Sequence, residues 1–304
     1  MAVVSEPPLN AGQAAASAVV PDINLQRNPF ELRAMQSVLL TGGAWTIAAL
    51  GAVPLLSVIY MLVVKGGARL SPELFTELPP AGFEAGGGIG NAIQGTLVTV
   101  AIASALSIPF ALLAAIYLAE LRPDSHLANW ARFLSKVLTG FPSILAGVFV
   151  YAAVVVVMGT YSALAGGIAL AVLMLPTVTL TAEGAMRMVP QRMKDAAIGM
   201  GCTRAQVVWS VTLPTALPSV VTGIILAVAR VAGESAPLLF TALFSNYWLR
   251  SITEPTASLS ILIFNFSSMP FDNQIELAWS ASLVLVLIVL SFNILSRFIG
   301  RPQV

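Results

Sequence analysis

Long stretches without a charged side chain alternate with short charged segments along most of this sequence. A helix of about 20 mainly apolar residues spans the hydrocarbon core of a bilayer, and the charge-free stretches reach that length. They run over 37–64, 91–119, 137–182, 218–243 (apart from Arg230 and Glu234) and 278–296. The third stretch is long enough for two spans with a turn at 159–162, so the pattern predicts six transmembrane helices.

The pattern divides the chain into one membrane domain and two tails. Residues 1–36 begin with a run rich in Ala, Pro and polar side chains, and we expect them to form a disordered tail. Residues 37–299 form the membrane domain, which contains the spans and a charged inner loop at 183–214. Residues 300–304 form a short C-terminal tail. The apolar run ASLSILIFNFSS, 257–268, is too short to span a bilayer, and we expect it to pack on the outer ends of the helices.

Composition agrees with a membrane protein and excludes several functions. Of the 304 residues, 57% are hydrophobic and 10% are charged, whereas soluble domains contain roughly 25% charged residues. The net charge of +1 implies no nucleic-acid partner, and a single Cys leaves no disulfide within the chain. The sequence lacks a P-loop, the His and Cys patterns of zinc sites and a nucleophile elbow, so we expect no catalytic residue, cofactor or metal.

Lys and Arg are distributed unevenly about the predicted spans. Six spans place both termini, and the loops after the second and fourth spans, on one side of the membrane. That side holds eleven of the 15 Lys and Arg residues, and the other side holds three. Because Lys and Arg accumulate in cytoplasmic loops, we expect both termini and the 183–214 loop to be cytoplasmic.

The inner loop is expected to form two short helices, at 186–201 and 203–211. Gly201 would turn the chain between them, because glycine adopts conformations that strain other residues. Leu213-Pro214 would end the second helix, since proline disfavours helical geometry in the residue before it. The residues alone leave two interpretations open, a docking surface and an ordinary solvated helical loop.

The spacing of residues in this loop resembles the EAA loop of ABC importer permeases. That pattern is Glu-Ala-Ala, three residues, Gly, nine residues, Ile, one residue and Leu-Pro. The matching positions, with Asp for Glu and Val for Ile, are Asp195, Ala196, Ala197, Gly201, Val211, Leu213 and Pro214. In that family the loop forms coupling helices that dock into a groove of a cytoplasmic ATPase, so the resemblance implies a role in ATPase coupling for these positions.

Other segments are similar to the permease subunits of phosphate-specific importers, the PstA type most of all. These segments are GGGIGNAIQGTLVTV, AIYLAEL, TGFPSILAGVF, LAVARVAGESAPLLFTALFSNYW and PTASLSILIFNF. The resemblance implies an all-α integral membrane protein with six transmembrane helices and the type I ABC importer (MetI-like) permease fold. It also implies a bacterial plasma (inner) membrane location, a PstC-type permease partner, two PstB-type ATPase subunits and an extracytoplasmic PstS-type phosphate-binding protein.

Arg230 and Glu234 interrupt the span predicted at 218–243. An ionised side chain at mid-bilayer costs about 2.5–3.5 kcal/mol on insertion scales, so such residues normally face a bundle interior or a wet cavity. Four residues apart on a helix, the two would share one face, near the middle of the span. One interpretation is a buried ion pair that neutralises itself. In the other, Arg230 lines the path and meets an oxyanion that suits its planar guanidinium, while Glu234 restrains Arg230.

The residues also leave alternatives for the substrate and the mechanism. The same fold could carry another tetrahedral oxyanion, such as sulfate or molybdate. About twelve helices with inverted repeats, or discontinuous helix pairs, would favour a self-sufficient channel or secondary carrier. Six spans and the EAA-like loop count against it. The missing catalytic constellation counts against an intramembrane enzyme.

Overall fold

The computed structural model describes residues 32–299 and divides into two units, residues 1–58 and residues 59–304. One helix, α2 (Leu32–Gly67), begins in the first unit and ends in the second. From residue 35 onward nearly all of its side chains are exposed. Residues 32–36, expected in the N-terminal tail, are therefore helical. The remainder of that predicted tail, and the predicted tail at 300–304, lie outside the described residues.

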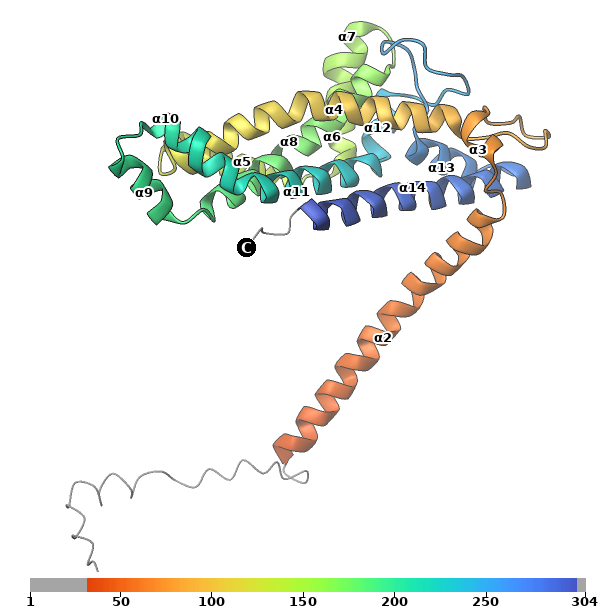
Figure 1. Cartoon of the computed structure of the whole chain (residues 1–304). Helices are drawn as coiled ribbons and strands as arrows, with labels where there is room; N and C mark the ends of the chain where they lie inside the picture. Colours follow the sequence, from red (N-terminus) through yellow and green to blue (C-terminus); the bar gives the residue numbers. More distant parts are fainter. Residues whose placement is uncertain (1–31, 300–304) are drawn as a thin grey trace, which may run out of the picture. The chain divides into compact units, whose positions relative to one another are not determined.

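Helices make up most of the second unit (Figure 1). They are α3 (Pro72–Thr76), α4 (Gly90–Ile116), α5 (His126–Thr139), α6 (Ser143–Val150), α7 (Val156–Met158), α8 (Ala163–Arg187), α9 (Gln191–Gly199), α10 (Arg204–Val207), α11 (Leu213–Ala232), α12 (Ala236–Thr241), α13 (Leu259–Ser267) and α14 (Asp272–Ile299). Three π-helical segments join some of them: η1 (Tyr117–Leu121), η2 (Tyr151–Val155) and η3 (Val208–Thr212). Within residues 32–299, five helices are long and apolar enough to cross a membrane, and the number rises to six when one bent helix pair is counted as a span. The prediction of an all-α membrane fold is confirmed.

The core of the second unit forms around α8, which packs against α4, α5, α6, α11 and α12. Leu170, Met174 and Val178 of α8 are buried in one cluster with residues of α4 and α11. Small residues let the helices approach closely, as is usual in membrane bundles. A side-chain carbon added at Gly167 would lie 2.5 Å from Cγ2 of Ile102, so α4 and α8 could not pack this way with a larger residue there.

The third span is broken rather than straight. α5 and the helix that begins with α6 meet at an angle of 105° across residues 140–142. The break follows from Pro142, which caps α6 and lacks the N–H that a continuous helix would need. The expected turn near 159–162 is confirmed, since Gly159 has φ 71° and the Ser162 side chain accepts a hydrogen bond from the Ala165 N–H.

The helix boundaries of the inner loop differ from the expectation. The first predicted helix, 186–201, is divided, because α8 continues to Arg187 and α9 begins only after Pro190. The prediction that Leu213-Pro214 ends the second helix is wrong, because one helix runs from Arg204 to Ala232. Pro214 lies in the first turn of α11, and the wider π turns of η3 precede it. Such local π-helical turns let a helix continue past a proline, because they provide other partners for the backbone carbonyl that the proline leaves without a donor.

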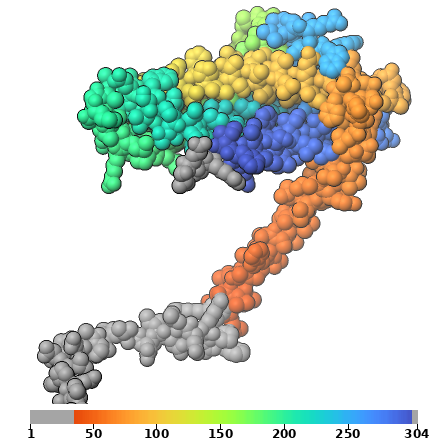
Figure 2. Space-filling model, viewed as in Figure 1, coloured from red at the N-terminus to blue at the C-terminus, as the bar shows by residue number. Residues whose placement is uncertain are grey.

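The two ends of the second unit carry different short elements. α9 and α10 lie together at one end, beyond the C-terminal end of α4, and α3 and α13 lie toward the other end (Figures 1 and 2). α13 packs as expected for a segment too short to span, with Leu259, Leu262 and Phe266 buried against residues of α4 and α14. The inner-loop helices are thus separated from the opposite end by the length of α4.

Candidate functional site

Arg230 and Glu234 lie close together, but they do not share a helix. Arg230 is in the last turn of α11, which ends at Ala232, and Glu234 follows the cap residue Gly233. The prediction that both lie on one helix face is therefore wrong. The break is explained by Pro237, because a continuous helix would need its missing N–H to bond the Gly233 carbonyl, and the ring would clash there.

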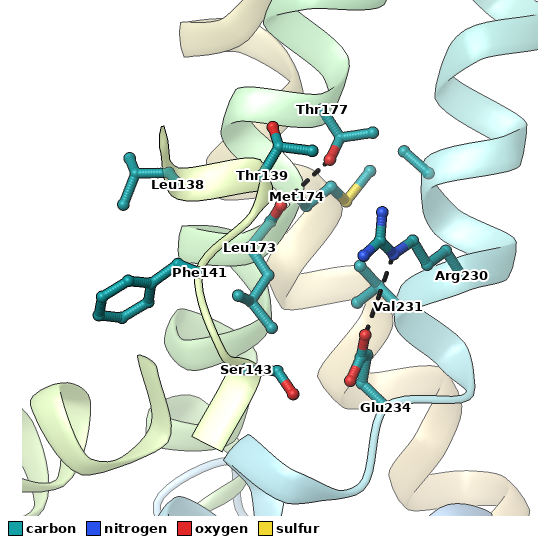
Figure 3. Close-up of a pocket in the computed structure, with 11 residues that line it drawn as sticks. Leu138, Thr139, Phe141, Ser143, Leu173, Met174, Thr177, Arg230, Val231 and Glu234 are labelled. Atoms are coloured by element: carbon teal, nitrogen blue, oxygen red, sulfur yellow. Dashed lines mark hydrogen bonds and ion pairs between the residues drawn. The ribbon is translucent and has the colours of Figure 1, made fainter. Parts of the chain in front are cut away.

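A small cavity, about 30 Å³ in volume, lies beside Arg230 and Glu234 (Figure 3). Three hydroxyl-bearing side chains line it, those of Thr139, Ser143 and Thr177. The remaining lining is apolar and comes from Leu138, Phe141, Leu173, Met174, Ala227 and Val231. Thr177 is near the middle of α8, so the cavity is near mid-height of that span. A cavity of this volume holds about one water molecule, so an oxyanion could enter only after neighbouring helices move.

The contact between Arg230 and Glu234 is loose. Arg230 Nε lies 4.0 Å from Glu234 Oε1, beyond the ~2.7–3.2 Å of a hydrogen bond. The two side chains are 59% and 23% exposed, which differs from a closed, buried ion pair. Glu234 itself is held in place, since its carbonyl accepts a hydrogen bond from Ser260 Oγ at 3.0 Å. The guanidinium therefore retains donors that a ligand could use.

Two helix breaks meet at this cavity. α5 ends at Thr139 and α6 begins at Ser143, while α11 ends four residues before α12 begins. Lining residues come from both breaks and from α8. Secondary transporters commonly bind substrates where discontinuous helices expose polar groups near mid-membrane, so the two breaks by themselves do not separate a permease from the secondary carrier considered above. Both breaks fall inside stretches that the charge pattern predicts as spans, 137–182 and 218–243.

The residues of the EAA-like pattern fall on α9, on the turn at Gly201, on η3, which holds Val211, and on α11. Asp195, Ala196 and Ala197 are on α9, where Ala197 is buried and the other two are exposed. Leu213 and Pro214 open α11.

Gly201 has φ 91°, as expected for the residue that turns the chain, and no neighbouring atom lies within 4 Å of a Cβ added there. Thr203 then starts α10 with a capping box in which its side chain and that of Gln206 bond each other's backbone N–H groups. Ile198 and Met200, on either side of Gly199, are 51% and 80% exposed. The α9–α10 corner thus presents an apolar surface at the end of the bundle.

A buried charged network at the same end was not anticipated from the sequence. Glu183 Oε1 lies 2.6 Å from Arg132 Nε and 2.9 Å from Arg187 Nη2. Lys194 Nζ lies 2.5 Å from Glu120 Oε1, and both of these side chains are about 10% exposed. The sequence feature that could have indicated this network is Glu183, which directly follows a long apolar stretch. Ionisable residues at membrane depth are usually paired.

Known proteins share both the sequence and the fold of this chain. Residues 107–301 match the family of binding-protein-dependent transport system inner membrane components. The phosphate transport system permease protein PstA of Yersinia pestis is 39% identical over 274 residues, covering 90% of this chain and 90% of the relative. The probable PstA of Methanocaldococcus jannaschii is 38% identical over 264 residues, covering 86% of this chain and 92% of the relative.

A solved structure of the inward-facing MetNI methionine ABC transporter has the same fold. Its TM-score is 0.53 at 20% identity, over 70% of this chain and 95% of the solved chain. The matched fold and the level of sequence identity lead to one assignment. The chain belongs to the binding-protein-dependent transport system inner membrane components, the permeases of ABC importers, and among them to the PstA-type phosphate transport permeases.

Proposed function

We propose that this chain is the PstA-type permease subunit of an ATP-driven importer of inorganic phosphate, with Arg230 and Glu234 on its translocation path. The site rests on the placement of Arg230, whose side chain is 59% exposed and lines a cavity near mid-height of α8 together with three hydroxyl-bearing side chains. A charge at such depth normally faces a wet path. An oxyanion in transit would supply the counter-charge that Glu234 only loosely provides.

The chemistry of the lining suits a tetrahedral oxyanion. The planar guanidinium of Arg230 can donate two parallel hydrogen bonds to phosphate. The Ser143 hydroxyl is an additional donor beside the same space. The hydroxyls of Thr139 and Thr177 also line it but donate to the carbonyls of Ser135 and Leu173, so each would have to turn to bond an anion. Between passages, Glu234 would take back the guanidinium, which it already approaches to 4.0 Å.

The permease would form half of the path, and partner subunits would supply the rest. The partners are a PstC-type permease, two PstB-type ATPases and an extracytoplasmic PstS-type phosphate-binding protein. The names of the relatives and the EAA-like pattern at Asp195, Ala196, Ala197, Gly201, Leu213 and Pro214 support this assembly. ATP hydrolysis would be carried out by the ATPases, since this sequence has no P-loop.

The orientation follows from the charge bias. Lys and Arg are concentrated around α9 and α10 and toward both termini, so these parts would face the cytoplasm of a bacterial plasma (inner) membrane. ATPase docking would then occur at the α9–α10 corner. The phosphate-binding protein would dock at the opposite end, where α3 and the segment after α12 lie.

Uptake by the reconstituted complex tests the substrate assignment. Vesicles containing the permease pair and the ATPases, with the binding protein added outside, would be given labelled phosphate, sulfate or molybdate. We expect ATP-dependent uptake of phosphate and much weaker uptake of the other two. Preferred uptake of sulfate or molybdate would contradict the assignment, and uptake by this chain alone without ATP would indicate a channel or secondary carrier.

A further inference from the structure

α9 is fastened to the bundle by an ion pair that is almost fully enclosed. Lys194 Nζ lies 2.5 Å from Glu120 Oε1, and each side chain is about 10% exposed. Lys194 and Ala197 are the buried residues of α9. Ala197 offers only a methyl group for packing, whereas a buried charge requires its partner in place. The Glu120–Lys194 pair is therefore a specific connection between α9 and the rest of the bundle.

Glu120 is part of η1, the π-helical segment that continues α4. The wider turns of π-helical segments alter where side chains point, and such segments are frequent at functional positions. The carbonyl of Leu118, also in η1, accepts hydrogen bonds from Arg132 Nη2 at 2.7 Å and from Arg187 Nη2 at 3.4 Å. The short segment η1 thus joins four elements: α4, which it continues, α5 and α8 through the two arginines, and α9 through Lys194.

α8 connects this junction to the Arg230 cavity. Arg187, in its last turn, bonds η1, and Thr177, earlier on the same helix, lines the cavity. α5 makes a similar connection, since Arg132 contacts the junction and Thr139 lines the cavity. A displacement of η1 would therefore act on two of the elements that close the space beside Arg230.

We infer that Glu120 and Lys194 are positioning residues that transmit movement of α9 to η1 and so couple ATP hydrolysis to opening of the Arg230 cavity. A charged pair allows one relative position of the two elements that carry it. A contact between small apolar groups would restrict that position less strictly. The inference rests on the proposed docking of an ATPase at the α9–α10 corner. It does not require that the transported anion be phosphate.

Charge substitution in the assembled complex tests the link. Glu120→Gln and Lys194→Met each remove one charge, and the double variant Glu120→Lys with Lys194→Glu exchanges them. At matched amounts of assembled complex, we expect each single variant to lower the phosphate moved per ATP about fivefold or more. The exchanged pair should recover most of that loss. Lys136→Met, which removes an exposed lysine of α5, should leave the ratio unchanged.

Cavity opening can be measured without any transported anion. In a Cys202→Ser background, Thr177→Cys places a thiol in the lining of the cavity. When Glu120 and Lys194 are unchanged, ATP should alter the rate at which this thiol is labelled. We expect Glu120→Gln and Lys194→Met to abolish this change while the ATPases remain bound. Normal ATP-dependent labelling in both single variants would overturn the link. The link would also be overturned if the exchanged pair moved no more phosphate per ATP than the single variants. The same holds if the single variants lowered the amount of assembled complex but not the phosphate moved per ATP. Absence of phosphate uptake by the wild type with this labelling intact would contradict only the proposed substrate.

Discussion

Arg132 Nε and Glu183 Oε1 lie 2.6 Å apart and join α5 to α8 in a largely buried setting. The same carboxylate oxygen lies 2.9 Å from Arg187 Nη2. The side chain of Glu183 is 7% exposed, so two guanidiniums take the place of water around its carboxylate. This shared carboxylate holds together the two helices whose other segments line the Arg230 cavity.

Glu183→Gln should destabilise the protein, because the substitution preserves shape but removes the charge shared by both arginines. Removing one partner from a buried pair costs about 3–5 kcal/mol. We expect thermal unfolding of the detergent-solubilised complex to shift down by roughly 5 °C or more. Glu276→Gln is the control, since Glu276 is 60% exposed and lies 3.6 Å from Arg69, and exposed pairs contribute about 0–1 kcal/mol. Equal shifts in the two variants would show that the Glu183 network adds nothing special.

Gly201→Ala should weaken ATPase association. Gly201 has φ 91° and open space around it, so the cost of a side chain there, about 1 kcal/mol or more, comes from the backbone alone. Gly199→Ala is a matched control, because Gly199 also has open space but lies in α9 without a positive φ. Copurification of the ATPases should fall for the first variant and persist for the second. Full copurification and uptake with Gly201→Ala would contradict a coupling role for this turn.

Thiol labelling of intact cells should report the orientation of the chain. The single cysteine, Cys202, is partly exposed beside the α9–α10 corner. A membrane-impermeant reagent added outside should leave it unlabelled, and opened membranes should allow labelling. As a control, Tyr247→Cys in a Cys202→Ser background should be labelled from outside, since Tyr247 is 77% exposed and follows α12. Labelling of Cys202 from outside as fast as in opened membranes would refute the six-span orientation.

The sequence predicted the features that depend on local chemistry. Charge-free length predicted the spans, and the turn at Gly159 and the positive φ of Gly201 follow from the conformational freedom of glycine. The close approach of Arg230 to Glu234 was also foreseeable from their spacing.

The breaks and the long-range pairs could not be read in the same way. Hydropathy is the same for a straight span and for one bent by 105° at Pro142, so the α5–α6 bend left no clear signal. A spacing of four residues predicts a shared helix, yet Pro237 ends that helix before Glu234. Lys194 and Glu120 are separated by 74 residues, and their contact depends on how α9 packs on η1.

The role of Arg230 is tested most directly by uptake of labelled phosphate in three variants at matched membrane levels. These are Arg230→Gln, Glu234→Gln and the double substitution, with Arg230→Lys added to separate charge from geometry. A charge-assisted contact worth about 2–5 kcal/mol corresponds to roughly a 30-fold loss or more. We therefore expect Arg230→Gln to be nearly inactive, and Arg230→Lys to be weak but measurable, because a point charge replaces a planar fork.

The double substitution decides between the two interpretations of the pair. If Arg230 and Glu234 only neutralise each other, removing both should be milder than removing either one. If Arg230 contacts the anion, the double variant must still fail. Arg230 is the one cationic residue among those that line the cavity, so the double variant leaves no positive charge there. We expect uptake by the double variant to be no better than uptake by Arg230→Gln, and substantial uptake by the double variant would contradict a contact between Arg230 and the anion.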